Sequence, residues 1–254
     1  MRFSALFLAA ILLLTSSPAR ADVYLEEQIS RGEGAQPETM RLYANKDSLR
    51  LEEGEDEVIV YRADKQVAWY LSAADKTCIE VPWADLRNTL EQTQQAYEQG
   101  VKAIDQAIET MQKTPGVTKE QIDEMKQERA KLEVHVEDLG KETVAGHACT
   151  HVKITQAEQP AIEVWSAEDF ANAAEVAQFN LYRLARESWG WYFGKVKGVP
   201  LRIIVHAEEG DAIQQKSEVV KVEEKALDAA LFEIPSGYTK TSSVEPPSGD
   251  GGGK

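Results

Sequence analysis

The sequence lacks the signatures of the common enzyme classes. It contains no Gly-x-Ser-x-Gly, no His-Glu-x-x-His, no phosphate-binding loop and no dinucleotide-binding fingerprint. Histidine is scarce, with four residues in the chain. The tightest group, His147-x-Cys149-x-His151, extends about 13 Å along a strand, so its two histidines are too far apart to share one ion. The sequence therefore predicts no enzyme, no metal site and no cofactor.

Long hydrophobic runs are also scarce. Ala5–Leu14 is such a run, preceded by Arg2, but its ten residues are too few to cross a membrane, which takes about 20. Small residues follow at Ala19 and Ala21, as in signal peptides that are cleaved on export. We therefore predict that residues 1–21 are a signal peptide and that the exported chain starts at Asp22. No later run is long enough to span a membrane.

Basic residues are in the minority. Loss of Arg2 and Arg20 with the leader leaves 26 basic and 43 acidic residues, a net charge of −17. Nucleic acids and anionic lipid head groups repel such a chain, so neither is an expected partner. Charge of this size also favours a monomer. The mature length of 233 residues fits one domain with an insertion.

The chain has only two cysteines, Cys78 and Cys149. Because none precedes Cys78, an N-terminal cysteine that carries a lipid anchor is excluded. Both cysteines enter an oxidising compartment, where an even pair favours a bridge. Each lies on the more polar face of its predicted strand. If the chain between them is an insertion that connects two neighbouring strands of the sheet, the two sulfurs lie close together. We therefore expect a Cys78–Cys149 disulfide.

Short segments with alternating apolar residues, separated by turn residues, predict strands in most of the chain. Six of them form an antiparallel meander in residues 22–82: Val23–Ser30, Thr39–Asn45, Ser48–Glu53, Val58–Arg62, Gln66–Ser72 and Lys76–Val81. Further strands are expected at Thr143–Val144, His147–Thr155, Ala161–Ser166, Leu201–His206 and Lys216–Val222. A closing turn is expected at Ala226–Phe232.

Helical periodicity replaces this alternation between residues 83 and 134. Apolar residues from Leu86 to Met111 recur at intervals of three and four, and Thr114-Pro115-Gly116 interrupts the pattern. Thr118 and Gln121 then form a capping box that starts a second helix. The segment 83–134 is therefore expected to be an inserted helical hairpin. It packs on the sheet or on itself, or it binds a partner as a coiled coil.

A third helical segment, about residues 168–187, leads into the aromatic run Trp189-Gly190-Trp191-Tyr192-Phe193. This run has neither strand nor helix alternation, and its glycines allow unusual backbone angles. Two interpretations stay open: the run fills the concave face of the sheet as core, or it is a mobile lid over an apolar cavity. Residues 241–254, rich in Ser, Pro and Gly, are expected to be a disordered tail.

Several motifs resemble a bacterial periplasmic family, the domain of unknown function 4412 family. They are Met40–Asn45, Val67–Leu71, Thr77–Pro82, Val144–Cys149, Ile162–Trp165, Gly198–Leu201 and Leu231–Tyr238. That family is similar to the periplasmic carriers of outer-membrane lipoproteins (LolA/LolB-like). The resemblance implies an antiparallel half-barrel around an apolar cavity lidded by helices. It covers most of residues 23–240.

Residues and resemblance together predict an α+β fold and a periplasmic location. One carrier-like domain at residues 22–240 has a curved antiparallel sheet, the hairpin insertion at 83–134 and a helical aromatic lid. We expect it to bind an apolar ligand, a lipid or an acylated protein, without catalysis. The alternative is an envelope interaction scaffold that docks a partner through the hairpin. The residues expected to border the ligand are Leu184, Trp189, Trp191, Tyr192, Phe193 and Leu201.

Overall fold

The computed structural model describes residues 21–32, 34–54, 56–157, 159–174, 176–177, 195–207 and 212–242. The predicted signal peptide up to residue 20, most of the third helical segment with the aromatic run at 189–193, and the tail from residue 243 lie outside these ranges. The domain boundaries predicted from the sequence therefore remain predictions.

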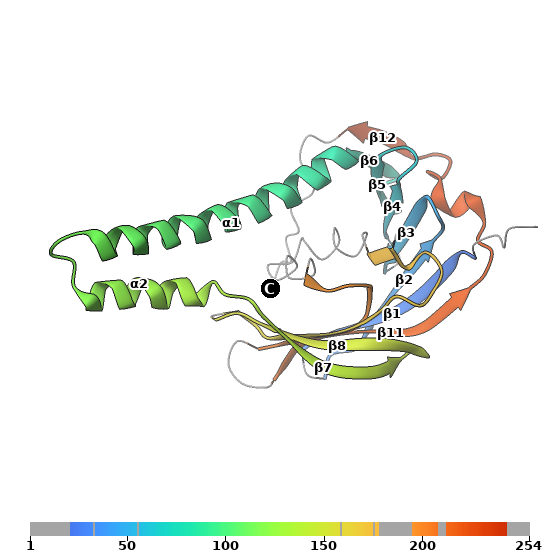
Figure 1. Cartoon of the computed structure of the whole chain (residues 1–254). Helices are drawn as coiled ribbons and strands as arrows, with labels where there is room; N and C mark the ends of the chain where they lie inside the picture. Colours follow the sequence, from blue (N-terminus) through green and yellow to red (C-terminus); the bar gives the residue numbers. More distant parts are fainter. Residues whose placement is uncertain are drawn as a thin grey trace, which may run out of the picture.

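Twelve strands form one curved sheet in the order β12-β6-β5-β4-β3-β2-β1-β11-β10-β9-β8-β7 (Figure 1). The strands of the first half are β1 (Val23–Arg31), β2 (Glu38–Ala44), β3 (Ser48–Glu53), β4 (Glu57–Arg62), β5 (Val67–Ser72) and β6 (Thr77–Pro82). Those of the second half are β7 (His135–Val144), β8 (His147–Thr155), β9 (Ile162–Ala167), β10 (Val199–His206) and β11 (Ile213–Glu224). The last strand, β12 (Thr239–Ser242), runs parallel to β6, and all other pairs are antiparallel.

The sheet consists of two meanders joined by their first and last strands. Strands β1 to β6 follow one another in space, and so do β7 to β11, and the antiparallel pair of β1 with β11 joins the two sets. The sheet stays unclosed, with β12 at one edge and β7 at the other. The segment between β6 and β7 therefore links the two ends of the sheet, so β6 and β8 are not neighbours.

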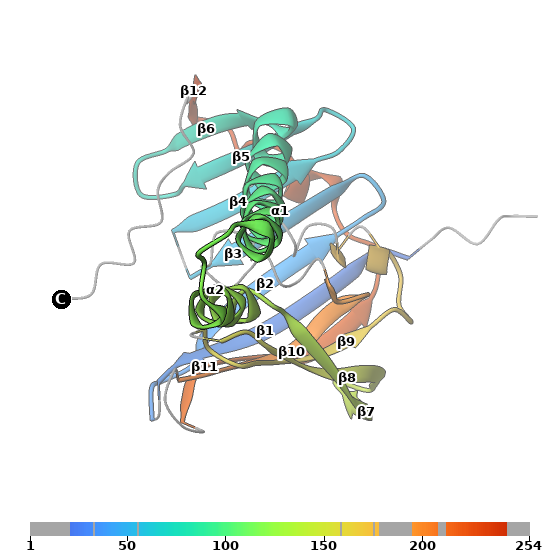
Figure 2. The same cartoon turned by 60° about the vertical axis from the view of Figure 1, so that its left-hand side comes forward.

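Two helices occupy that link. Helix α1 (Trp83–Lys113) and helix α2 (Lys119–Lys131) lie side by side on the hollow side of the curved sheet (Figures 1 and 2). The Thr118 side chain accepts a hydrogen bond from the backbone N–H of Gln121, and the Gln121 side chain bonds back to the backbone of Thr118, so the predicted capping box is confirmed. Arg129 of α2 pairs with Asp105 of α1 at 2.9 Å, which ties the two helices together.

The predicted strands match the observed ones closely in the first half, and β3 and β8 have the predicted bounds. Three strands were missed or clearly shortened, and of the twelve residues of β11 the prediction had Lys216–Val222. The prediction had only Thr143–Val144 of the ten-residue β7, and β12 lies where the disordered tail was expected to begin. The closing turn is present as the short 3₁₀ helix η2 (Ala229–Phe232).

Candidate binding face on the hollow side of the sheet

The hollow side of the sheet carries a continuous apolar row. Directly paired residues on seven neighbouring strands, from β11 to β6, form it: Val222, Leu25, Leu42, Leu51, Ile59, Tyr70 and Ile79. Because alternate residues of a strand share a face, the next row on the same side holds Val23, Ala44, Leu49, Tyr61, Ala68 and Val81. We call these two rows and their apolar neighbours on β8 to β10 the inner face.

The inner face continues across the second meander. Ile203 of β10 lies opposite Val164 of β9, which lies opposite Val152 of β8. Val205, Ile162 and Ile154 form a parallel row. The last three are at most 1 % exposed, so this half of the inner face is well packed. Val134, just after α2, and Val196, just before β10, pack against it.

The inner face becomes polar at one end of the strands. The row beyond Ile59, Tyr70 and Ile79 consists of Glu53, Glu57, Ser72 and Thr77, which are exposed or half-buried. One polar pair lies further in: the Ser217 hydroxyl donates a hydrogen bond to the buried carboxylate of Glu27. The inner face therefore has an apolar centre and a polar margin at one end, which we call the polar margin.

Helix α1 packs on the inner face near its start. Trp83 and Leu86 pack against the largest buried cluster, which we call the inner core. The Trp83 ring meets Tyr61 edge-on at 5.7 Å between ring centres. Further along, the Tyr97 hydroxyl donates to the carbonyl of Leu132 beyond α2. Phe170, Ala173 and Val176, in the described part of the third helical segment, also pack on the inner core. Helix α1 thus leans away from the sheet after its first turns, and α2 runs back towards the sheet (Figure 1).

Among the residues predicted to border a ligand, the structure describes Leu201. It is 1 % exposed and belongs to the inner core, which also contains Trp165 and Cys149 from the other side of the second meander, so its burial alone does not place it beside a ligand. Leu184, Trp189, Trp191, Tyr192 and Phe193 lie outside the described residues. Their role remains a prediction. Sequence reasoning did not single out the apolar row itself, because it becomes visible only when the strand register aligns residues from seven strands.

The predicted disulfide is not formed in the structure. Cys78 and Cys149 are both free, and each is buried in an apolar cluster although it shares its strand face with polar residues, Glu80 for Cys78 and His151 for Cys149. The expectation assumed that their strands were neighbours, but β6 and β8 lie near opposite ends of the sheet. Burial raises the pKa of both thiols above the usual value, so they are present as neutral thiols near neutral pH.

The outer side of the second meander holds a polar row instead. His151, Trp165, Arg202 and Glu218 lie opposite one another on four strands. The His151 ring stacks on Trp165 at 3.8 Å, and Arg202 donates to Glu218 at 2.9 Å. Beside this row, the carboxylate of Glu163 accepts hydrogen bonds of 2.8 Å from Nε2 of His151 and of His206.

The Glu163 carboxylate stays charged because of these two partners. Burial alone would raise its pKa, but the hydrogen bonds and charges of His206 and His151 outweigh burial and hold the pKa below the usual value. His151 of the sequence group His147-x-Cys149-x-His151 thus pairs with a carboxylate on the next strand. His147 pairs with Asp169 at 3.0 Å. In the described part of the chain, no cluster of His, Cys, Asp and Glu is arranged to hold a metal ion.

Comparison with known proteins assigns the family. The family model described as "Domain of unknown function (DUF4412)" matches residues 105–238, which is more than half of the chain. The chain belongs to the DUF4412 family. This confirms the family resemblance inferred from the motifs. A search of curated proteins finds no match.

Several solved structures match this DUF4412 protein at low sequence identity. An uncharacterized conserved protein from Thermus thermophilus is 11 % identical, with a TM-score of 0.45 and coverage of 88 % of this chain and 91 % of the other. A LolA-superfamily protein from Nitrosomonas europaea is 9 % identical, with a TM-score of 0.29 over 85 % and 91 % of the two chains. The Pseudomonas aeruginosa MucA/MucB complex is 9 % identical, with a TM-score of 0.41 over 84 % and 56 %. Similarity at this level assigns no function.

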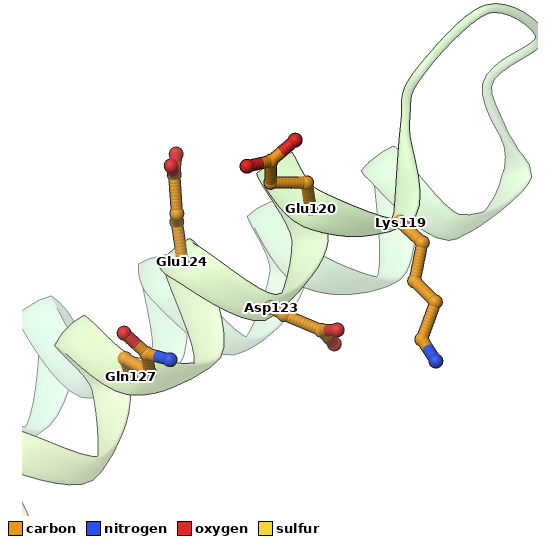
Figure 3. Close-up of a pocket in the computed structure, with 5 residues that line it drawn as sticks. All are labelled: Lys119, Glu120, Asp123, Glu124 and Gln127. Carbon is orange, nitrogen blue, oxygen red and sulfur yellow. The ribbon is translucent and has the colours of Figure 1, made fainter.

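A shallow recess of the DUF4412 protein lies outside the inner face. It lies on the first turns of α2 and is lined by Lys119, Glu120, Asp123, Glu124 and Gln127 (Figure 3). All five residues come from one helix, and Glu120 and Glu124 point to one side while Lys119 and Asp123 point to another. Such a surface has no opposing wall to enclose a ligand. Within the described ranges, no helix is both long and apolar enough to cross a membrane.

Proposed function

We propose that this protein binds an apolar ligand, a lipid or the acyl chain of a lipoprotein, on the inner face, without catalysing a reaction. The observation that supports this most is the apolar row across seven strands from Val222 to Ile79. Leu25, Leu42, Leu51 and Ile59 of this row are at most 8 % exposed, so an acyl chain would have to displace the side chains that cover them. Each methylene that it then buries contributes about 0.8 kcal/mol. The predicted export of the chain would bring it to the compartment where such ligands travel.

The polar margin gives the bound ligand a direction. An amphiphile with its chain on the apolar row places its head group at the end where Glu53, Glu57, Ser72 and Thr77 lie. The carboxylates of Glu53 and Glu57 at this margin would repel a negatively charged head group. We therefore expect the inner face to prefer ligands whose head group is neutral or cationic.

The aromatic run remains part of the proposal. Trp189, Trp191, Tyr192 and Phe193, with Leu184 before them and Leu201 on the sheet, would border the ligand as a lid. If the run is a lid, Trp191→Ala weakens binding of a fluorescent fatty acid and leaves the melting temperature nearly unchanged. If the run is core instead, the same substitution costs about 3–5 kcal/mol of stability.

The alternative function, docking of a partner through α1 and α2, has less support. The large apolar side chains that are exposed among the described residues are Val136, Leu139, Ile213 and Val220, and all four lie on strands. Helix α1 contacts α2, and of its apolar residues Leu86 packs on the inner core and Ile108 is 9 % exposed. A partner would have to bind the charged outer faces of the two helices.

The proposal is tested by titration with a fluorescent fatty acid. Ile29, half-buried on β1 on the same side as Leu25, is replaced by asparagine, and Val220, exposed on β11, is replaced in the same way as a control. Ile29→Asn should raise the Kd about tenfold, since it loses about 1.4 kcal/mol of apolar contact, and Val220→Asn should leave the Kd unchanged. Melting temperatures show that both variants fold. Absence of saturable binding by the unaltered protein would contradict the proposal.

A further inference from the structure

A buried amide lies where the N-terminal segment enters the fold. Asn172 is 0 % exposed, and its Nδ2 donates a hydrogen bond of 3.1 Å to the carbonyl of Ala21. Ala21 is the last residue of the signal peptide that the sequence predicts. Asn172 has a φ of 56°, in the left-handed region that asparagine, aspartate and glycine tolerate best.

The amide oxygen of Asn172 has no hydrogen-bond partner among the described residues. Oδ1 of Asn172 is buried without a hydrogen bond. An unpaired buried acceptor is costly, and most such groups in native proteins are satisfied. The chain that carries Ala21 lies at hydrogen-bonding distance from this side chain, so a donor created at that point of the chain would satisfy Oδ1.

Asp22, the next residue, is held firmly in the fold. Its Oδ2 accepts a hydrogen bond from the backbone N–H of Leu227, and its carbonyl accepts one from Lys225, both at 2.9 Å. Strand β1 begins directly after it, at Val23. The nitrogen of Asp22 therefore stays in place whether or not other residues precede it.

Cleavage between Ala21 and Asp22 changes the chemistry beside Asn172. Hydrolysis adds water across the peptide bond: Ala21 leaves with a carboxylate, and the nitrogen of Asp22 becomes an α-amino group. Such a group has a pKa of about 7.7–8.0 and is mostly protonated at neutral pH. A carbonyl acceptor is thereby lost, and an ammonium group with three N–H donors takes its place.

We propose that Asn172 is the receiving site for the N terminus that this cleavage creates. Rotation of its amide about the Cβ–Cγ bond presents Oδ1 where Nδ2 lay, so one side chain serves both forms of the chain. Before cleavage Nδ2 donates to the Ala21 carbonyl, and after cleavage Oδ1 accepts from the Asp22 ammonium. This inference rests on the predicted cleavage site and is independent of the proposed ligand binding.

The test compares two chains with defined N termini. One begins at Asp22, and in the other the tripeptide Gly-Ser-Gly precedes Ala21, which keeps the peptide carbonyl and moves the ammonium away. Each chain is made with Asn172, Asn172→Asp and Asn172→Gly, since all three residues tolerate the left-handed backbone. Melting temperatures are measured at pH 7. The reactivity of the α-amino group towards an acetylating reagent is measured by mass spectrometry of the N-terminal peptide.

Asn172→Asp should change the melting temperatures of the two chains differently. In the extended chain the new carboxylate faces the Ala21 carbonyl and cannot donate to it, so the melting temperature should fall by about 3–8 °C. In the chain that begins at Asp22 the carboxylate pairs with the ammonium, and the melting temperature should stay equal or rise. Asn172→Gly should lower the melting temperature of both chains and make the α-amino group of the Asp22 chain several times more reactive.

Equal shifts of the melting temperature in both chains, together with unchanged reactivity of the α-amino group in Asn172→Gly, would overturn the proposal. N-terminal sequencing of the exported protein adds an independent check. A mature chain that begins at a residue other than Asp22 would also overturn it, even if the inner face binds lipid as proposed.

Discussion

Glu163 joins three strands through its two carboxylate oxygens. His151 comes from β8, His206 from β10, and each Nε2 lies 2.8 Å from a different oxygen of Glu163 on β9. Because all three side chains are largely buried, each hydrogen bond is shielded from water and is stronger than a similar bond on the surface. This arrangement makes the second meander sensitive to the protonation of one residue.

Replacement of Glu163 by glutamine should lower the free energy of unfolding by about 1–3 kcal/mol at pH 7, because it weakens two hydrogen bonds to a charged acceptor. The folded-state pKa of Glu163 lies below the ordinary value of 4.5. Its contribution is therefore complete above the ordinary pKa and is lost as the pH falls through the lowered pKa. Urea titrations at a series of pH values check this: the gap between the two proteins should close in acid.

Glu137→Gln is the matched control, since Glu137 is exposed on the edge strand β7. It should leave stability within about 0.5 kcal/mol at every pH. A gap for Glu163→Gln that is constant from pH 7 into acid would show that the carboxylate charge does not stabilise the fold.

Both cysteines should behave as protected thiols. Cys78 is 0 % exposed and Cys149 is 1 % exposed, and burial raises the pKa of each, so the reactive thiolate is scarce. The native protein should react slowly with a disulfide reagent such as Ellman's reagent. After denaturation without reductant, two thiols per chain should react. No reactive thiol in the denatured protein would mean that the two cysteines are bridged after all.

Two glycines with similar backbone angles, Gly146 and Gly198, have different surroundings. Gly146 in the β7–β8 turn and Gly198 before β10 have similar positive φ angles, 86° and 83°. An added Cβ meets nothing within 4 Å at Gly146, but at Gly198 it would lie 2.5 Å from the carbonyl oxygen of Ala167. Gly198 thus lets the chain pass close to the end of β9, whereas Gly146 serves only the turn.

Alanine at these two positions should therefore have unequal effects. Gly146→Ala should cost about 1–2 kcal/mol, the strain of a left-handed alanine. Gly198→Ala adds the clash with the backbone and should cost about 2–5 kcal/mol in total. Urea denaturation of both variants measures the difference. Equal losses would show that the contact between Gly198 and Ala167 relaxes at no cost.

Strands with one buried face could be predicted from the sequence, and edge strands could not. In β3 apolar and polar residues alternate because one face packs in the core, and its predicted bounds match the observed ones. In β5 five apolar residues follow one another, and its predicted start differs from the observed one by one residue. Nine of the ten residues of β7 are exposed, so no alternation marks it. The four residues of β12, Thr-Lys-Thr-Ser, are polar and pair with β6 on one side only.

The joining of the two meanders into one sheet depends on one strand pair that could not be predicted from the sequence. Val23 of β1 pairs with Glu224 of β11, about two hundred positions away in the chain, and this pair joins the two meanders into one sheet. Without it, β6 and β8 were expected to be neighbours on either side of the helices, which led to the wrong pairing of the cysteines. The apolar inner face also depends on it, since the row from Val222 to Ile79 crosses this junction.

Native mass spectrometry of the protein purified from the cells that produce it tests the central claim most directly. The inner face is proposed to hold an apolar ligand, so the spectrum should show the mature chain with a non-covalent adduct of lipid or acyl mass. Extraction with organic solvent should remove the adduct, and incubation with a lipid extract should restore it. A spectrum that contains only the mass of the mature chain, before and after incubation with lipid, would contradict the account.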